Sequence, residues 1–337
     1  MGTTENYSFS TAYQQLLEPF GLTSRGYVTM LTAATVTGLN IANQFQYDSS
    51  GELTQVTTPL GGILQWAYRT YTYSTSGRSY REIQTRYLQL SSGGTQYQWN
   101  VGMDNGAVWH GSTTLTDVGA NNPQKVWTFS TNGNSFPGLA TAYEEHDVNF
   151  GAVLLHKDYT WTTDNSGQGT GRPYVGTVVT KLSPNTSSEA DTKTVQTLDT
   201  HGNLTQSQVY DYGSSTPTRT YTYSYLTGSN YASHSIYNRL TSAFVTPNTT
   251  TLVTNSYDGS PAPTCTGIGG LQPSQAQSMH DNTNYGTGFT YRGNLTQTTG
   301  LIGGNTRCYA YDTAGVMYQT VDGTGNSVGV STDSTTS

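Results

Sequence analysis

The sequence predicts an all-β protein made of successive antiparallel hairpins, and three observations support this prediction. Only 10% of the 337 residues are charged, while 26 are Tyr and 38 are Gly. Tyr and Thr favour half-buried pleated strands, whereas Gly and Asn favour hairpin turns. In addition, a short turn unit recurs at several places along the chain. The low charge and the many aromatic residues also argue against general disorder.

The turn unit places Asp and Gly at the first and fourth positions of a type I turn. The Asp carboxylate can accept a hydrogen bond from a backbone N–H two residues later, and Gly adopts backbone angles that bulkier residues resist. Full copies begin at Tyr47-Asp48, Leu198-Asp199 and Tyr311-Asp312, and a shortened copy without Asp begins at Tyr291. The residues expected to form structural turns are Asp48, Gly51, Asp199, Gly202, Gly293, Asp312 and Gly315.

Residues 1–40 are expected to form a lead-in to these hairpins. Ala12 to Leu17 could form one or two helical turns, which Pro19 would end. From Gly26 onward the pattern becomes that of strands, because Tyr27 to Leu31 alternate, although imperfectly.

The hairpin region is expected to span residues 41–323 and to be divergent over 91–190. Within it, 69–73 and 219–225 alternate strictly between Tyr or Arg and smaller polar residues. Strict alternation is typical of strands with two different faces.

Two segments near the C-terminus lack this alternation. Residues 258–274 are rich in Pro and Gly and are expected to form a long loop. Residues 324–337 consist largely of Ser, Thr, Gly and Asp, and we expect them to form a disordered tail.

The repeated pattern resembles the YD-repeat family, also called the RHS-repeat family, of bacterial wall-associated proteins and toxin shells. The resemblance is clearest at 45–80, where Gly51, Leu53, Pro59 and Trp66 fall in the order of the repeat, and it is fair at 196–225 and 289–322. It implies an extended, curved sheet of hairpins that forms part of a spiral shell. The family's Asp-Pro-x-Gly motif, which lies beside a self-cleavage site, does not occur in this sequence. The resemblance therefore implies neither an autoprotease nor a toxin activity for this chain.

Charge and hydropathy exclude two classes of partner. The formal net charge is −7, and Lys and Arg are scattered, so the sequence offers no basic face for nucleic acid. The most apolar stretch, 27–41, is short and rich in Thr, so no membrane insertion is expected. No secretory signal is visible at the N-terminus. The expected location, extracellular or at the cell surface, therefore depends on the resemblance.

The two cysteines, Cys265 and Cys308, leave two alternatives open. They could form one disulfide if the compartment is oxidising, or they could be two free, buried thiols.

Two polar clusters are candidates for chemistry. Glu144 to Asp147 could hold a divalent cation, although four polar residues in a loop are more often simply solvated. His156 to Asp158, with His110 or His201, could suggest acid–base catalysis, but no nucleophile motif accompanies them. We therefore expect no catalytic residue, no metal site, no cofactor and no enzymatic activity.

Aromatic residues are the remaining candidates, because flat rings on an exposed sheet can stack on sugar rings. The alternative for each of them is cross-strand pairing that stabilises the sheet. The possible glycan-contact residues are Trp66, Tyr71, Tyr73, Trp99, Trp109, Trp127, Tyr221, Tyr223 and Tyr225.

The sequence thus favours a non-enzymatic structural or adhesive module of a large bacterial surface or secreted protein. Its partners would be glycans, other copies of itself or the rest of a larger shell. The alternatives are a self-assembling filament or shell subunit, the encapsulating part of a polymorphic toxin, and, less favoured, a polysaccharide-active enzyme.

Overall fold

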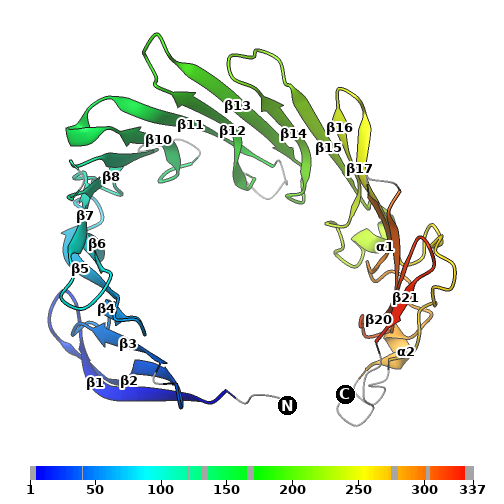
Figure 1. Cartoon of the computed structure of the whole chain (residues 1–337), viewed down its shortest axis with the longest axis horizontal. Coiled ribbons are helices and arrows are strands. Elements are labelled where there is room, and N and C mark those ends of the chain that lie inside the picture. Colours follow the sequence, from blue (N-terminus) through cyan, green and yellow to red (C-terminus); the bar gives the residue numbers. More distant parts are fainter. Residues whose placement is uncertain are drawn as a thin grey trace. The chain divides into compact units, whose positions relative to one another are not determined.

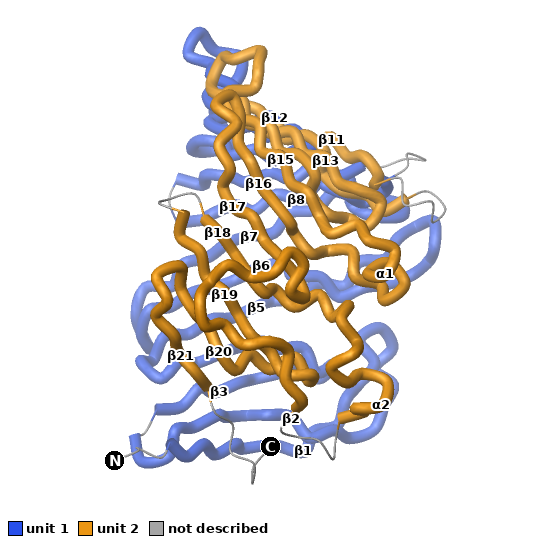
Figure 2. Tube along the Cα trace, turned by 90° about the vertical axis from the view of Figure 1, so that its right-hand side faces the viewer, with its two compact units in different colours: residues 1–159, 179–191 blue, residues 160–178, 192–337 orange. Residues whose placement is uncertain are grey.

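The computed structural model describes residues 5–39, 41–119, 121–130, 136–164, 171–274, 280–300 and 304–330. The chain divides into two compact units (Figure 2). Unit 1 comprises residues 1–159 and 179–191, and unit 2 comprises residues 160–178 and 192–337. None of the helices in the described ranges is long and apolar enough to span a membrane.

Unit 1 is a sheet in which each strand lies antiparallel to the next strand in the sequence (Figure 1). A 3-10 turn at Val148–Phe150 joins the last two strands. The strands that lie wholly or mostly in unit 1 are β1 (Tyr7–Leu17), β2 (Ser24–Val36), β3 (Ile41–Tyr47), β4 (Leu53–Thr57), β5 (Ile63–Thr72), β6 (Ser79–Gln89), β7 (Gln96–Met103), β8 (Ser112–Asp117), β9 (Gln124–Phe129), β10 (Ala140–His146) and β11 (Val153–Thr163).

Unit 2 continues the same construction, with antiparallel pairing of successive strands from β13 to β21. Two single-turn helices, α1 (Ser229–Ala232) and α2 (Asn282–Tyr285), lie in connecting segments. The strands that lie wholly or mostly in unit 2 are β12 (Pro173–Leu182), β13 (Ala190–Leu198), β14 (Leu204–Tyr210), β15 (Arg219–Tyr225), β16 (Leu240–Thr246), β17 (Thr250–Tyr257), β18 (Leu295–Gly300), β19 (Thr306–Tyr311), β20 (Met317–Asp322) and β21 (Ser327–Gly329). The predicted all-β fold of successive antiparallel hairpins is therefore confirmed.

The sheets have little buried core. Most strand residues are half-buried, and one cluster of fully buried apolar residues comprises Cys265, Cys308 and Val321 in unit 2. Cross-strand contacts and backbone hydrogen bonds must therefore carry much of the stability. Tyrosines contribute directly, because the hydroxyls of Tyr68 and Tyr225 donate to the carbonyls of Leu53 and Leu204 at 2.8 and 3.0 Å.

The helix expected at Ala12–Leu17 is wrong, because these residues belong to strand β1. In β1, Ala12 lies opposite Met30 and Gln14 lies opposite Val28 of β2. Pairing along a whole strand satisfies more backbone groups than one or two helical turns can, so tertiary context overrides the local helix preference. After β1 the chain turns, and the N–H of Glu18 donates to the carbonyl of Thr23 at 2.7 Å.

The disordered tail expected at 324–337 is wrong for its first part. Residues Ser327–Gly329 form β21, which pairs with β20. Residues 331–337 lie outside the described residues.

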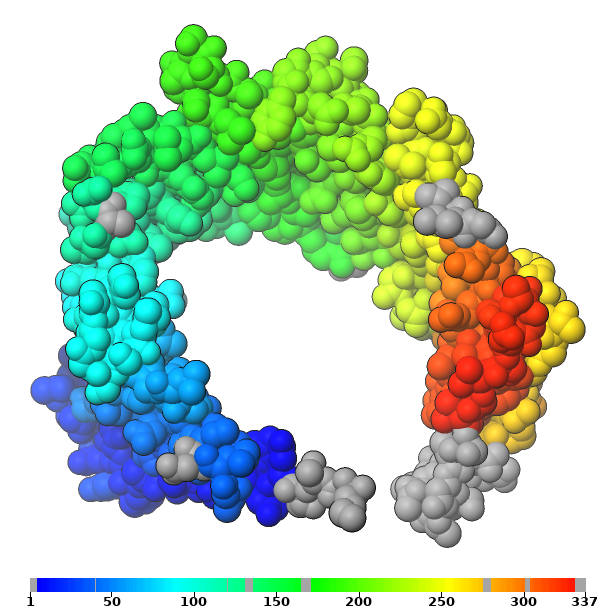
Figure 3. All heavy atoms as spheres, viewed as in Figure 1, coloured from blue at the N-terminus to red at the C-terminus, as the bar shows by residue number. Residues whose placement is uncertain are grey.

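The two cysteines form a disulfide, with an S–S distance of 2.08 Å and a Cα–Cα distance of 6.0 Å. The bridge fastens the long loop expected at 258–274 to strand β19. In Figure 3, the red atoms, which belong to the C-terminal end of the described chain, lie beside the yellow and orange atoms of the segment that contains this loop. Contacts agree with the view, since the Nε2 of Gln319 donates to the carbonyl of Gly267 at 3.0 Å.

Candidate functional site

The predicted turn residues Asp48, Asp199 and Asp312 make the same hydrogen bonds in three places. In each turn, the Asp Oδ1 accepts from the backbone N–H groups of the residues two and four positions later, at 2.8 to 3.0 Å. The Gly after the turn has a φ of +84°, +84° and +83° at Gly51, Gly202 and Gly315, in the region that favours glycine. The donor pairs are Ser50 and Glu52, His201 and Asn203, and Ala314 and Val316.

The shortened copy at 291–296 has an Asp after all, supplied from far earlier in the sequence. The carboxylate of Asp258 accepts from the backbone N–H groups of Arg292, Gly293 and Asn294, at 2.9, 2.7 and 2.9 Å. The unit is therefore Tyr257-Asp258, an insertion at 259–291, and then Arg292-Gly293-Asn294. We call it the split turn. The pair Tyr257-Asp258 was the sequence signal for it.

A further turn of the same kind begins at Asp322 and was not predicted. Its Oδ1 accepts from the N–H groups of Thr324 and Asn326, at 3.0 and 2.9 Å. The spacing Asp-x-x-Gly-Asn at 322–326 repeats that at 199–203, so the signal was present. Hydrogen bonds from the Asn326 amide lead the causes that hold the pKa of Asp322 below its usual range.

All nine predicted aromatic residues are half-buried rather than fully exposed. Several of them use their polar atom inside the protein. The donors and their acceptors are Tyr71 to the Gly106 carbonyl at 2.8 Å, Tyr73 to Glu82 at 3.3 Å, Trp109 to the Ser130 carbonyl at 2.7 Å, and Tyr225 to the Leu204 carbonyl at 3.0 Å. Burial is also the cause that raises the pKa of Tyr223. Trp127 packs against Tyr143 with a centroid distance of 5.1 Å.

Trp66 and Trp99 lie on one face of β5 to β7, with Arg86 opposite both of them on the strand between. The Arg86 guanidinium lies 5.5 Å from the Trp99 ring centroid. These residues line a groove of about 440 Å³, whose remaining walls are largely apolar and include Val101 and Leu115.

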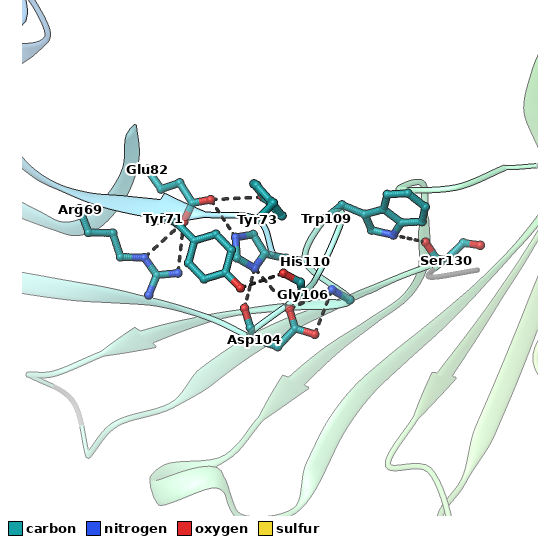
Figure 4. Close-up of polar contacts among 10 residues, drawn as sticks. Arg69, Tyr71, Tyr73, Glu82, Asp104, Gly106, Trp109, His110 and Ser130 are labelled. Carbon is teal, nitrogen blue, oxygen red and sulfur yellow. Dashed lines mark hydrogen bonds and ion pairs between the residues drawn. The ribbon is translucent and has the colours of Figure 1, made fainter. Parts of the chain in front are cut away.

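His110 is at the centre of a polar cluster in unit 1 (Figure 4). Its Nε2 lies 2.8 Å from the Glu82 Oε1, and its Nδ1 lies 2.6 Å from the Asp104 carbonyl. Both oxygens only accept hydrogen bonds, so these two contacts hold the imidazole ring in place from both sides. The Glu82 carboxylate also accepts from Arg69 at 3.2 Å and from the Tyr73 hydroxyl. Burial first, and then the Glu82 charge, raises the pKa of Tyr73 to about 12.

The cluster fastens a loop rather than exposing reactive groups. The side chains of His110 and Glu82 are 9% and 10% exposed. Both carboxylate oxygens of Glu82 are engaged, one by Arg69 and the other by His110 and Tyr73. Residues 104–111 are thereby held against β5 and β6, which is a structural role.

Glu144 is the centre of a second polar cluster in unit 1. Its two carboxylate oxygens each lie 2.9 Å from a histidine nitrogen, Oε1 from His156 and Oε2 from His146. The other nitrogen of His156 lies 2.9 Å from Asp158. Burial opposes ionisation of Glu144, but hydrogen bonds from His156 and His146 outweigh it and lower its pKa.

At Glu144–Asp147, which was considered as a cation site but not expected to be one, a carboxylate lies between two histidines. Glu145 points to Tyr143 instead, accepting from its hydroxyl at 2.6 Å, and Asp147 accepts from the Val148 N–H. Within the described ranges, no group of three or more His, Cys, Asp or Glu side chains is arranged to hold a metal ion.

The histidines predicted as catalytic candidates have separate surroundings. His156 contacts Glu144 and Asp158, His110 contacts Glu82 and Asp104, and His201 stacks on Tyr237 with centroids 3.8 Å apart. None of these sets includes a Ser, Thr or Cys side chain in the position of a nucleophile.

A cavity of about 170 Å³ lies beside the split turn in unit 2. Its walls come from three parts of the chain, namely the insertion, the strands around it and the split turn itself. The lining residues are Asp258, Gly259, Pro263, Gly269, Gly270, Leu271, Thr287, Thr290, Arg292, Asn294, Thr296, Tyr309, Ala310 and Tyr311. Sequence reasoning did not find this cavity, because its walls are distant in the sequence.

No protein-family model matches the chain, and no curated protein matches it either. Among solved structures, the chain is similar to TcdB2-TccC3-Cdc42, with 12% identity, a TM-score of 0.42 and coverage of 91% of this chain and 15% of that chain. It is also similar to TcdB2-TccC3 without its hypervariable C-terminal region, with 13% identity, a TM-score of 0.35 and coverage of 93% and 15%. A porin-like protein from Bacteroides uniformis has 12% identity, a TM-score of 0.22 and coverage of 61% and 81%. The chain spans 15% of the length of the first two structures, and at these scores the assignment of the fold rests on the strands themselves.

Proposed function

We propose that the chain is a non-enzymatic structural module of the YD-repeat type, belonging to a larger bacterial surface or secreted protein. The observation that carries this proposal is the recurrence of one turn geometry. Asp48, Asp199, Asp258, Asp312 and Asp322 each hold a hairpin turn with their carboxylate. A repeated unit of this kind builds an extended surface, which suits a scaffold.

The polar clusters support a structural role. Both carboxylate oxygens of Glu82 and of Glu144 lie within 3.2 Å of a side-chain nitrogen, so neither group is a free base for general acid–base chemistry. An enzymatic role would need a converging set of unpaired groups beside a pocket, as in paired carboxylates.

The disulfide between Cys265 and Cys308 supports an extracellular or surface location. Disulfides form and persist mainly in oxidising compartments. An oxidising environment is therefore part of the proposal.

Association with further strands is also part of the proposal. Strand β1 lies at the end of the unit 1 sheet (Figure 1). Its side chains Tyr7, Phe9 and Tyr13 are 59%, 67% and 73% exposed. Long edge strands with exposed apolar residues and few charges favour pairing with another chain. The partners would be the rest of a larger shell or other copies of this chain, and the shell could be that of a polymorphic toxin.

Glycan binding is the second candidate function. It is favoured by Trp66 and Trp99, whose rings share one groove, and by the cavity of unit 2. Rings that offer both a flat face and a polar edge suit sugars.

The proposal is tested on the purified chain by four measurements. Light scattering and electron microscopy should show association at high concentration, and a polysaccharide panel should yield no new reducing ends. A glycan array tests adhesion separately. Hydrolysis of any polysaccharide would overturn the assignment as a structural module. Absence of binding to the glycan array at high micromolar concentration would refute the adhesive function.

A further inference from the structure

We infer that the cavity beside the split turn binds a single neutral sugar ring, a pyranose at the end of a glycan. This inference rests on the adhesive part of the proposed function and names its site. None of the aromatic residues that the sequence suggested lines this cavity.

The insertion at 259–291 is more than the turn requires. In the other turns of this type, Asp Oδ1 reaches N–H donors two and four positions later, whereas Asp258 reaches Arg292 34 positions later. In both cases the carboxylate accepts from backbone N–H groups of the residues that close the turn, and the short turns do so without an insertion. What it adds is one wall of the cavity, including Pro263, Leu271 and Thr290.

The cavity walls are held in place by covalent and polar contacts. The disulfide Cys265–Cys308 fastens the first part of the insertion to β19. Arg292 fastens the last part, because its guanidinium donates to the carbonyls of Phe289, Gly286 and Tyr285 in the insertion and to that of Thr313 beyond it. A preformed wall lowers the entropic cost of binding.

The size of the cavity suits one six-membered ring. Its volume is about 170 Å³. An apolar cavity of about 150 Å³ accommodates benzene, so this space takes one ring and excludes a second. A longer glycan would therefore insert only its terminal residue and leave the remainder in solvent.

The chemistry of the walls selects a neutral polar ring. The charged groups are already engaged, since Asp258 accepts from three backbone N–H groups and the Arg292 guanidinium donates to four carbonyls. An anionic ligand would find no free cation there.

Neutral polar side chains remain available at the same walls. Over the part of the chain that the structure describes, the side chains of Thr287, Thr290 and Asn294 make no hydrogen bond. Leu271, Pro263 and Ala310 add apolar surface. A pyranose presents hydroxyls at its rim and C–H groups on its faces, which matches walls of this composition.

The test uses the whole chain and saturation-transfer NMR with the methyl glycosides of glucose, galactose, mannose and N-acetylglucosamine. The variant N294V/T290V removes one amide and one hydroxyl from the walls. Val316 occupies the position of Asn294 in the turn at 312–316, so valine is compatible with the turn. The matched control is T254V, which changes an exposed threonine of β17 outside the cavity.

We expect at least one glycoside to bind wild type and T254V equally, and to bind N294V/T290V about tenfold or more weakly, since each lost hydrogen bond contributes roughly 1 kcal/mol. Thermal melting of each variant checks that it is folded. Equal binding by a folded N294V/T290V, or no binding of any glycoside to wild type, would overturn the inference. If the double variant still binds the glycan array, the chain is adhesive but this cavity is not the binding site.

Discussion

Asp258 and Asn294 form a reciprocal pair of hydrogen bonds although a long insertion separates them in the sequence. The Oδ1 of Asp258 accepts from the Asn294 N–H at 2.9 Å, and the Asp258 N–H donates to the Asn294 carbonyl at 2.9 Å. Asp199 and Asn203 form the same pair within one short turn, at 2.9 and 2.8 Å. The same reciprocal pair therefore forms whether a short or a long segment joins its two residues. The Asp carboxylate accepts in both turns.

The substitution D258A should destabilise unit 2 more than D199A does. It leaves three backbone N–H groups without their acceptor and frees the insertion. A loss of about 2–4 kcal/mol is expected, against about 1–2 kcal/mol for D199A. Urea unfolding measures both, with D191A, at an exposed aspartate, as the control. Wild-type stability of D258A would show that the carboxylate does not hold the split turn.

Two glycine substitutions should separate backbone strain from steric contact. Gly51 and Gly315 have φ of +84° and +83°, but only at Gly51 would a Cβ meet a neighbour, the Leu16 Cδ2 at 3.0 Å. G315A should therefore cost about 1 kcal/mol from strain alone, and G51A more.

The control for this pair is G270A, whose backbone is not in the left-handed region and whose Cβ would have open space. It should change the free energy of unfolding little. If G315A is as stable as G270A, then alanine adopts the left-handed backbone of this turn without a cost in the free energy of unfolding.

Stability should fall as pH rises above about 6.5, the unfolded pKa of histidine, because His156 then loses its proton. Burial opposes its protonation, but Asp158 and then Glu144 outweigh burial and raise its pKa. A raised folded-state pKa stabilises fully below the unfolded value of about 6.5, and this contribution is lost as pH rises through the folded value. The lowered pKa of Glu144 acts in the opposite direction, because its contribution is present above its unfolded value and lost as pH falls.

The measurement is the melting temperature of wild type and H156Q between pH 4 and 9. The decline with rising pH should be smaller in H156Q, whereas H234Q, at an exposed histidine that contacts no carboxylate within the described ranges, should behave as wild type. NMR titration of His156 checks the direction of the shift. A His156 pKa below its usual value would contradict the prediction.

Loss of the disulfide should destabilise unit 2 selectively. The bridge joins two cysteines that are 43 residues apart. Its restriction of the unfolded chain predicts that it stabilises the fold by about 4 kcal/mol. In C265A/C308A, hydrogen exchange should therefore rise in β19 and the insertion and stay unchanged in β5 and β6. Equal exchange in wild type and C265A/C308A would indicate that the bridge is dispensable, and thiol titration of the unfolded wild-type chain verifies that it forms.

The sequence by itself determined the fold class and the turns. Strict alternation at 69–73 and 219–225 and the Asp-x-x-Gly spacing are local, and each reports a local backbone preference. For this reason Asp48, Asp199 and Asp312 were found correctly, and Asp322 could have been found from the same spacing. The helix at Ala12–Leu17 failed because six residues carry too weak a helix preference to compete with a neighbouring strand.

Only the tertiary structure decided which distant residues meet. The union of Asp258 with Asn294, the bridge from Cys265 to Cys308, and the cavity between the insertion and the sheet all join segments tens of residues apart. No periodicity in the sequence encodes such contacts, since they depend on the register of several strands at once. The aromatic residues illustrate the same limit, because a tyrosine such as Tyr225 looks identical in sequence whether its hydroxyl faces solvent or, as here, the Leu204 carbonyl.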